Sequence, residues 1–393
     1  MKKEEVFKTY EDYILSTYTR LPLIFTKGKG SKLVDVDGKE YLDFFPGWGV
    51  SNVGHCNAQV VSSVRDQIGK LIHIPNNYYS IPQAKLAKEI IYWSFDGKVF
   101  FCNSGAEANE AAIKLARAYG KQERFEIICF ENAFHGRTLG ALSATPQAKY
   151  QKAFEPLLPG FKVAKFNDLD SVKNNLTSKT VAIILELIQG EGGINVASKS
   201  FVKNLRLLCD EKKLLLIIDE VQTAMGRTGK MFCYQNYDTI PDIMTLAKSL
   251  GGGLPIGAMV VTRKISDTLK PGMHASTFGG SPLVCKAALG AFKALQKDKM
   301  LTNTGKMSEY IFTKLKELKN KYSFIKEVRG MGLMIGIELE KQGKVVVEEC
   351  IKKGLLINCT HERVLRLMPA LSVTKKQIDK AVSMLDSVFK NFN

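Results

Sequence analysis

Residues 214–222 read Leu-Leu-Leu-Ile-Ile-Asp-Glu-Val-Gln, a run of aliphatic side chains followed at once by polar ones. A run that is apolar on both faces is typical of a strand buried in a parallel sheet between layers of helices. Similar runs occupy residues 99–102, 127–130 and 181–185, and helical stretches separate them. The sequence therefore predicts an α/β fold with a mainly parallel central sheet flanked by helices.

The two ends of the chain show a different pattern. Residues 32–43 alternate apolar and polar side chains around Asp37-Gly38, which indicates a β-hairpin. Beyond about residue 300, lysine-rich amphipathic helices at 306–321 and 375–390 flank short strands. These strands are expected at residues 326–329, 333–339, 355–358 and 364–367. We expect both ends of the chain to form one smaller α+β domain.

The length of 393 residues exceeds what a single hydrophobic core usually organises. We expect a large α/β domain at residues 61–297. The small domain would combine an N-terminal segment, residues 1–60, with a C-terminal part, residues 298–393. Two lobes of this kind imply a cleft between them.

Composition argues against several classes of protein. Hydrophobic residues make up 45% of the chain, but no apolar run approaches the roughly 20 residues that cross a bilayer. Polar and aromatic residues follow the start of the chain in place of a secretory signal. We therefore expect a cytoplasmic protein with no membrane partner.

The formal net charge of +17 raises the possibility of a nucleic-acid partner. Lysines carry most of this charge and are spread over helical stretches and loops, without an arginine-rich arm or an aromatic-basic alternation. A solvated basic surface with no bound nucleic acid is the better interpretation. The eight cysteines occur singly, without a CxxC pair, and the five histidines form no HExxH, so we expect reduced thiols and no metal site.

Polar residues stand directly after three of the apolar runs. Asp219 follows the strand at 214–218, Glu186 follows the strand at 181–185, and Asn103-Ser104 precedes a helix that starts near Gly105. Ligands of parallel α/β sheets bind at the carboxyl ends of the strands. A helix start of small residues can hold a phosphate, although an ordinary N-cap also explains Asn103-Ser104.

A buried carboxylate and a lysine beside glycines suggest a cofactor. Asp219 next to an aliphatic strand needs a cationic partner, such as a protonated pyridine nitrogen. A metal-binding or Walker-B aspartate is the alternative, but no G-x4-G-K-[ST] accompanies it. Lys248 precedes Gly251-Gly-Gly253 and can form an imine if its pKa is lowered, although a loop lysine has the same sequence signal. Together with the helix start, these residues meet the requirements of pyridoxal 5'-phosphate.

Seven motifs, taken together, resemble the class III, or ornithine-type, aminotransferases, in the family's order and through nearly the whole chain. They are Asn103-Ser-Gly-Ala-Glu-Ala-Asn-Glu110, Phe134-His-Gly-Arg137, Gln189-Gly-Glu-Gly-Gly193, Asp219-Glu-Val-Gln-Thr223, Gly226-Arg-Thr-Gly229, Leu246-Ala-Lys-Ser-Leu-Gly-Gly-Gly-Leu-Pro255 and Ser276-Thr-Phe-Gly-Gly280. The resemblance implies the fold of type I pyridoxal-phosphate enzymes, with a large domain and a smaller one built from both termini.

The resemblance also implies a set of cofactor-binding residues. These are Lys248, Asp219, Gln222, Ser104, Gly105, Ala106, Phe134 and Thr277. Lys248 would hold the cofactor as a Schiff base, Asp219 would pair with the pyridine nitrogen, and Gln222 would contact the ring hydroxyl. The helix start would bind the phosphate, and Phe134 would stack on the ring. Thr277 would reach the phosphate bound to the neighbouring subunit, which implies a homodimer with shared active sites.

The motif at 103–110 looks particularly like the acetylornithine branch of the family. It implies ping-pong transfer of the terminal amine of N-acetylornithine to 2-oxoglutarate, giving N-acetylglutamate semialdehyde and glutamate, as a step of arginine biosynthesis. Ornithine, succinylornithine, succinyldiaminopimelate and 4-aminobutyrate are the substrates of the close alternatives. An NAD-dependent oxidoreductase is an alternative from another class, but the glycine cluster at 330–336 has the wrong spacing for it.

The substrate-binding residues implied by the resemblance are Arg137, Glu191, Arg366 and Ser276. Arg137 would grip the carboxylate distant from the reacting carbon, as a planar bidentate fork. Glutamate carries a second carboxylate on the reacting carbon, and Arg366 would bind it. Glu191 would mask Arg366 while acetylornithine is bound, so that the two residues form a switch. A permanent structural ion pair is the alternative.

Several positions depart from the family pattern. They are Leu187, Ser281, Ala370 and the stretch Pro46-Gly-Trp-Gly-Val50. None of them belongs to the cofactor-binding set. Trp48 and its neighbours would line the substrate side, so they leave open which acyl group is preferred.

Overall fold

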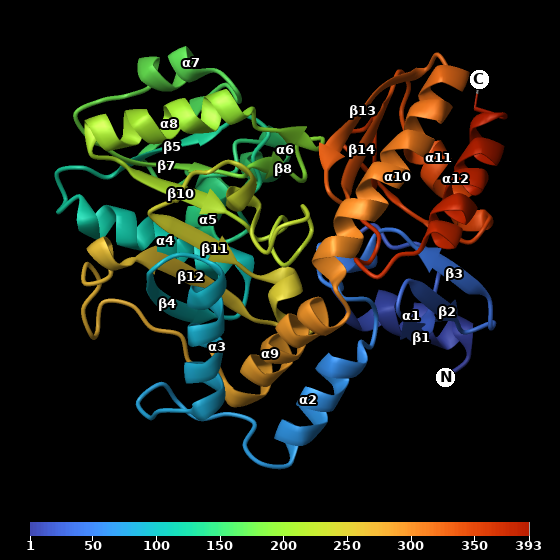
Figure 1. The fold of residues 1–393 in the computed structure, drawn as a ribbon, viewed down its shortest axis with the longest axis horizontal. Helices are drawn as coiled ribbons and strands as arrows, with labels where there is room; N and C mark the ends of the chain where they lie inside the picture. The colour runs from blue at the N-terminus through green and yellow to red at the C-terminus, as the bar shows by residue number, and fades with distance from the viewer. Residues whose placement is uncertain (393) are drawn as a thin grey trace.

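The fold is described for residues 1–392, in a computed structural model of the chain (Figure 1). Its centre is a seven-stranded sheet in the order β4-β12-β11-β10-β7-β5-β6. These strands are β4 (Gly97–Cys102), β5 (Glu126–Phe130), β6 (Phe161–Ala164), β7 (Thr180–Leu185), β10 (Leu215–Asp219), β11 (Ile243–Leu246) and β12 (Gly257–Thr262). All neighbours pair in parallel except β12, which is antiparallel to both β11 and β4. The predicted α/β class with a mainly parallel sheet is confirmed.

Alternate residues of β10 explain why its sequence is apolar on both faces. Leu215 and Ile217 pack in a cluster with helix α4 (Gly105–Tyr119), whereas Leu216 and Ile218 pack in a second cluster with α8 (Lys199–Lys212) and α9 (Pro282–Lys297). Every residue of the strand is buried. Helices therefore cover both faces of the sheet, and the removal of this apolar area from water stabilises the layered arrangement.

The predicted hairpin at the N-terminus is also present. It belongs to a sheet with the order β1-β2-β3-β15, in which the last strand comes from the C-terminal part of the chain. The strands are β1 (Phe25–Lys29), β2 (Lys32–Asp35), β3 (Glu40–Asp43) and β15 (Leu355–Leu356). The two ends of the chain therefore share a sheet, and both lie to the right of the large lobe in Figure 1.

The C-terminal sheet has the order β13-β14-β17-β16 and packs against two helices, which in turn pack against a third. Its strands are β13 (Ile325–Met331), β14 (Met334–Leu339), β16 (Asn358–Thr360) and β17 (Val364–Leu367), and the helices are α10 (Met300–Lys321), α11 (Lys344–Lys352) and α12 (Lys375–Phe389). The single strand predicted at 355–358 is wrong. The chain leaves the N-terminal sheet after Leu356 and enters the C-terminal sheet at Asn358, so two short strands replace one.

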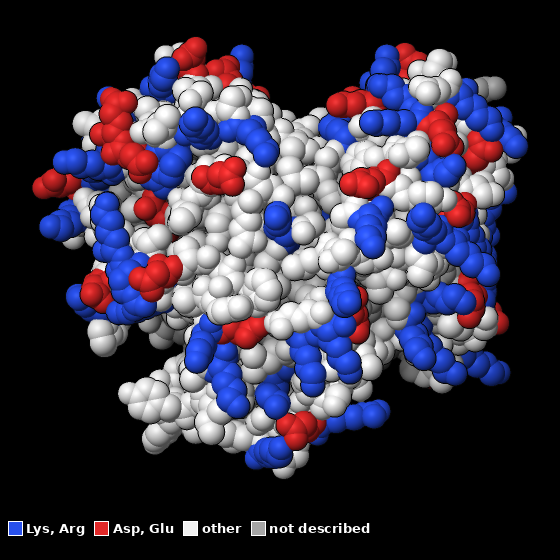
Figure 2. All heavy atoms as spheres, in the orientation of Figure 1, with Lys and Arg blue, Asp and Glu red and all other residues white. Residues whose placement is uncertain are grey.

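The other α-helices and one pair of short strands lie outside these three sheets. They are α1 (Lys3–Tyr13), α2 (Ala58–Ile68), α3 (Ile81–Trp93), α5 (Leu139–Ser143), α6 (Ala148–Gln151), α7 (Leu169–Asn174), and the paired strands β8 (Ile188–Gln189) and β9 (Asn195–Val196). Within residues 1–392, no helix is both long and apolar enough to cross a bilayer. Basic side chains are spread over the lobes, with acidic ones between them, while the centre of the visible face carries few charges (Figure 2).

Candidate active site

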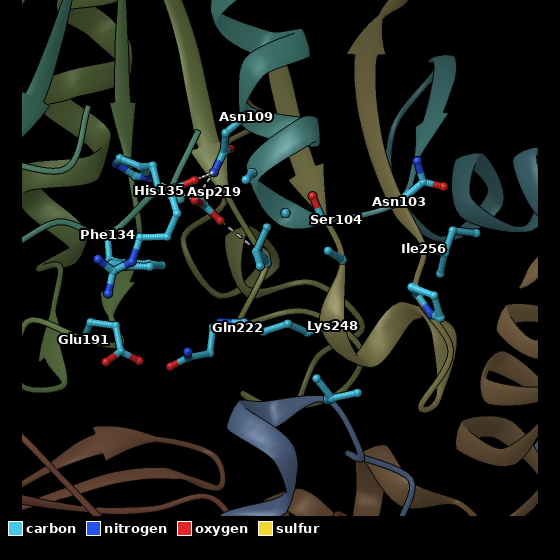
Figure 3. A pocket seen from close by; sticks show the side chains of 18 of the residues that line it. Asn103, Ser104, Asn109, Phe134, His135, Glu191, Asp219, Gln222, Lys248 and Ile256 are labelled. Carbon is cyan, nitrogen blue, oxygen red and sulfur yellow. Dashed lines mark hydrogen bonds and ion pairs between the residues drawn. The ribbon is translucent and has the colours of Figure 1, made fainter. Parts of the chain in front are cut away.

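A cavity of about 460 Å³ lies where the carboxyl ends of the central strands meet (Figure 3). Its walls are Val50, Asn103, Ser104, Gly105, Ala106, Asn109, Phe134, His135, Gly136, Arg137, Glu186, Glu191, Asp219, Val221, Gln222, Ala247, Lys248, Gly253, Leu254, Pro255 and Ile256. The strand ends of β4, β7 and β10, which the sequence singled out separately, therefore contribute to one site. Figure 3 shows Ser104, Asp219 and Lys248 around the same hollow.

The carboxylate of Asp219 is held by three donors. The Val221 N–H donates to Oδ1 at 2.9 Å, while Asn109 Nδ2 donates to Oδ2 at 2.7 Å and His135 Nδ1 lies 2.8 Å from the same oxygen. The side chain is 4% exposed. These hydrogen bonds fix the orientation of the carboxylate at the strand end.

Asn109 and His135 were not singled out from the sequence. Asn109 lies on the buried face of α4, where alanines surround it, and Thr245 Oγ1 donates to its Oδ1 at 2.7 Å. His135 is buried beside the cavity-lining Phe134. An amide on an otherwise apolar helix face was the available signal, because a buried amide needs hydrogen-bond partners.

Lys248 comes two residues after the end of β11 and begins a short 3-10 helix, Lys248–Gly251. Its φ is 43°, a left-handed conformation that L residues with a Cβ adopt only where the surrounding structure holds it. Removal from water lowers the pKa of the amine, and nearby Arg366 lowers it further against the opposing effect of Glu191. An amine with a lowered pKa is a better nucleophile at neutral pH.

The start of α4 forms one wall of the cavity. The Ser104 hydroxyl accepts the Glu107 N–H at 3.2 Å, so the N-cap interpretation of this serine is confirmed. Gly105 and Ala106 begin the helix and line the cavity, at the end where helix dipoles favour negative charge. A Cβ on Gly105 would come within 2.7 Å of Val221 Cγ1, so this position requires glycine.

Arg137 lies at the edge of the cavity, against two aromatic rings. Its guanidinium carbon is 3.9 Å from the ring centroid of Tyr150 and 5.5 Å from that of Phe134. Tyr150, from α6, was not singled out from the sequence. Stacking on aromatic faces orients a planar guanidinium and leaves its edge free for a carboxylate.

Arg366 is fully buried and paired with Glu191. Its Nη1 donates to Glu191 Oε1 at 2.7 Å, and its Nη2 donates to Asn358 Oδ1 at 2.9 Å. The rings of Phe45 and Trp48 lie 4.6 and 5.5 Å from its guanidinium carbon. Burial alone would raise the pKa of Glu191, but the Arg366 guanidinium outweighs it and holds that pKa below its usual value.

Glu186 joins two walls of the cavity. Its carboxylate accepts the Phe134 N–H and the Gly190 N–H, each at 2.9 Å. Burial raises the pKa of this carboxyl group, against the opposing effect of His135. The side chain thus fixes both the Phe134 loop and the turn that carries Glu191.

The remaining predicted site residues have different positions. Gln222 lines the cavity, and its Oε1 lies 3.3 Å from Arg366 Nη1. Ser276 and Thr277 lie outside this cavity in the single chain. Ser276 Oγ instead accepts hydrogen bonds from Asn103 Nδ2 at 3.3 Å and from the Gly279 N–H at 3.1 Å, and Thr277 is exposed.

These residues fit pyridoxal 5'-phosphate. An amine of lowered pKa, a strand-end carboxylate and a helix start that requires glycine surround one cavity, and together they supply an attachment point, a partner for a pyridinium and an anion site. The fold and the site thus define a pyridoxal-phosphate-dependent enzyme. The model of the family "Aminotransferase class-III" matches residues 13–389, and the chain belongs to this family.

Similar proteins agree with this assignment. The chain is 51% identical to an acetylornithine aminotransferase of Methanocaldococcus jannaschii, over 99% of both proteins. It is 48% identical to an acetylornithine aminotransferase of Aquifex aeolicus, over 96% of this chain and 99% of that protein. Among solved structures, ornithine aminotransferase from Toxoplasma gondii superposes with a TM-score of 0.95 at 31% identity, covering 100% of this chain and 96% of the other.

Proposed function

We propose that this chain is an acetylornithine aminotransferase, which transfers the terminal amine of N-acetylornithine to 2-oxoglutarate. The products are N-acetylglutamate semialdehyde and glutamate, and the reaction is a step of arginine biosynthesis. Several relatives with this name, at 42–51% identity over nearly their whole length, support the proposal. The ion pair between Glu191 and Arg366 is the structural observation that carries it. N-acetylornithine and glutamate place different demands on the cavity wall at Glu191, and Arg366 is buried against this residue.

The bound cofactor supplies an electron sink for the substrate carbon that loses a proton. Lys248 Nζ would hold the cofactor and would serve as the base that moves a proton at the substrate carbon. Asp219 would pair with the ring nitrogen, a role supported by the three groups that hold its carboxylate in place. Gln222 contacts the ring hydroxyl.

The phosphate and ring of the cofactor would lie against other walls of the cavity. The start of α4, with Ser104, Gly105 and Ala106, binds the phosphate through backbone N–H groups. Phe134 would stack on the ring, and Glu186 holds the Phe134 backbone in place. Thr277 is exposed in the single chain and would reach the phosphate bound to a second copy, so we propose a homodimer with shared sites, to which Ser276 also contributes.

The two amino donors share Arg137 but differ near the reacting carbon. Arg137 binds the distal carboxylate of both, and its stacking on Tyr150 supports this role. Acetylornithine presents methylene groups to Arg366, and an unpaired buried guanidinium there would be costly. Glu191 masks the guanidinium in that half-reaction and releases it when glutamate brings its own carboxylate.

The proposal extends to the organisation of the chain. Residues 61–297 would form the large cofactor-binding domain, and residues 1–60 and 298–393 would form the small domain that carries Arg366. We further propose that the enzyme acts in the cytoplasm on small-molecule substrates.

Ornithine aminotransferase is the second candidate, because solved structures of that activity superpose closely on this chain. The test is a set of amino donors with 2-oxoglutarate as common acceptor: N-acetylornithine, ornithine, N-succinylornithine, N-succinyldiaminopimelate and 4-aminobutyrate. We expect the highest kcat/KM for N-acetylornithine. A higher value for ornithine would replace the proposed activity with the second candidate.

A further inference from the structure

The turn that carries Glu191 is held by the C-terminal sheet through its backbone. Residues 190–193 follow β8 in the large lobe, yet three of their carbonyl groups accept hydrogen bonds from C-terminal strands. Arg366 Nη1, from β17, donates to the carbonyl of residue 190 at 2.7 Å. Thr360 Oγ1, from β16, donates to that of residue 191 at 2.6 Å, and Arg329 Nη2, from β13, to that of residue 193 at 2.6 Å.

The other side of the turn is fixed as well. Glu186 accepts the N–H of Gly190 at 2.9 Å, and Asn195 Nδ2 donates to the carbonyl of Gly192 at 2.9 Å. A backbone with this many partners would lose several hydrogen bonds if it moved as a whole. Arg366 can therefore be unmasked only if the Glu191 side chain rotates while the backbone of the turn stays in place.

Thr360 makes the bond nearest to the side chain that must rotate. Its hydroxyl donates to the backbone carbonyl of Glu191 itself. This carbonyl is attached to the same Cα as the side chain that carries the masking carboxylate. The bond therefore fixes the direction in which the side chain leaves the backbone. Thr360 is 6% exposed, so water does not readily replace its hydroxyl as the donor.

We infer that Thr360 is a positioning residue for Glu191, and that its hydroxyl sets how well the carboxylate masks Arg366. The inference rests on the proposed switch between Glu191 and Arg366, and it names Thr360 as the residue that holds the Glu191 side chain in position. Loss of the hydroxyl lets the carboxylate drift from the guanidinium. The acylornithine half-reaction then suffers, whereas the glutamate half-reaction, in which Glu191 has already moved away, does not.

A purely architectural role for Thr360 gives a different expectation. Strand β16 pairs with β17 through backbone groups, and Thr360 lies opposite Val364 in that register. Valine keeps the shape of threonine and the backbone pairing but lacks the donor. If the rate falls in Thr360→Val but is restored in Thr360→Ser, the loss comes from the missing hydroxyl and not from altered packing.

The test compares Thr360→Val, Thr360→Ser and Thr304→Val in the holoenzyme. Thr304 is the matched control, because it is fully buried in α10 and its hydroxyl also donates to a backbone carbonyl, that of Met300 at 2.8 Å. Single-turnover rates are measured for each half-reaction. We expect Thr360→Val to slow the N-acetylornithine half by about fivefold, in keeping with one lost hydrogen bond, and the glutamate half by less than about twofold. Thr360→Ser and Thr304→Val should stay within about twofold of the parent in both.

A second measurement does not depend on turnover. Glutarate, a dicarboxylate without an amine, needs an unmasked Arg366, so its dissociation constant should stay equal or fall in Thr360→Val. Equal losses in both half-reactions, weaker glutarate binding, or failure of serine to restore the rate would each overturn the inference.

Glu191→Ala, measured alongside, separates two kinds of failure. If that variant distinguishes the half-reactions and Thr360→Val does not, the positioning role is wrong and the switch stands. If Glu191→Ala affects both halves equally, the switch itself is wrong, and the inference falls with it.

Discussion

Lys248 occupies a strained left-handed position at the end of β11, where the surrounding protein lowers the pKa of its amine. We predict that borohydride treatment of the holoenzyme fixes the cofactor covalently to this residue, because an imine to Lys248 is reducible. Peptide mapping of the reduced protein identifies the modified lysine. Lys264→Ala, at an exposed lysine, should leave the labelling unchanged, and recovery of unmodified Lys248 from the reduced holoenzyme would contradict the assignment.

The pair between Glu191 and Arg366 predicts a dependence of stability on pH. Arg366 holds the pKa of Glu191 below its ordinary value of 4.5, despite burial. A carboxyl group with a depressed pKa in the folded state stabilises the fold above its unfolded pKa, and this contribution is lost as the pH falls through the folded pKa. We therefore expect Glu191→Gln to lower the free energy of unfolding by about 2 kcal/mol near neutral pH, and by less in acid.

Urea unfolding of the apoprotein, at neutral pH and below the ordinary pKa of glutamate, measures this difference. Glu11→Gln, at an exposed residue of α1, is the control and should show little difference at either pH. A loss of stability in Glu191→Gln that is the same at both pH values would show that the ion pair does not contribute through its charge.

Single residues also mark the limit of what the sequence could predict about the site. Ser104, Glu186 and Asp219 line one cavity because each stands after an apolar run, and strand ends of a parallel sheet meet at one edge. Lys248 and Gln222 line the same cavity, although Gln222 was implied only by the family resemblance. Asn109 and His135 complete the Asp219 network, but they come from α4 and from the loop after β5. A contact between side chains so distant in the sequence depends on tertiary packing, which local patterns do not encode.

At the scale of elements, the start of α4 packs against the end of β10 at the proposed phosphate site. Gly105 packs so closely against Val221 that a methyl group would force one of them to shift. Val221 lies between Asp219 and Gln222 in the chain, and a shift of Val221 would displace both. We therefore expect Gly105→Ala to weaken cofactor binding by at least about tenfold, the equivalent of 1.4 kcal/mol.

Gly305→Ala provides the matched control within another helix, α10, because no atom lies near a Cβ built at that position. Alanine in the middle of a helix is favoured over glycine by about 1 kcal/mol, so this variant should be more stable and bind the cofactor normally. The dissociation constant of the cofactor and the midpoint of thermal unfolding are measured for both variants and compared with those of the parent. Unchanged cofactor affinity in Gly105→Ala would show that the start of α4 does not hold the phosphate.

Element boundaries were predictable to different degrees. The apolar runs located β4, β5, β7 and β10 because strands buried on both faces need continuous apolar sequence. The antiparallel direction of β12 was not predictable, since a buried strand has the same side-chain pattern in either direction. The break at Ile357 was missed for a similar reason, because the strands on its two sides, β15 and β16, differ only in which sheet they join.

At the scale of the whole molecule, the single chain does not bring Thr277 to its own cavity. Thr277 lies exposed on the loop that precedes α9, outside the walls around Lys248. If the active site is shared, Thr277 of one copy completes the site that contains Lys248 of the other. This arrangement can be tested by combining two subunits with different substitutions in one dimer.

We predict that a mixed dimer of one Lys248→Ala subunit and one Thr277→Ala subunit contains one intact site. The intact site combines Lys248 of the second subunit with Thr277 of the first. The other site carries both substitutions. The Thr277→Ala homodimer should bind the cofactor more weakly in both sites, because each loses a hydroxyl donor to the phosphate. Differently tagged subunits allow the mixed dimer to be purified, and its cofactor affinity and activity to be measured per remaining Lys248. Affinity and activity equal to those of the parent mean that the threonine acts across the interface. Affinity as weak as that of the Thr277→Ala homodimer means that each chain uses its own loop, since the only site with a lysine would then be the one that lacks the threonine.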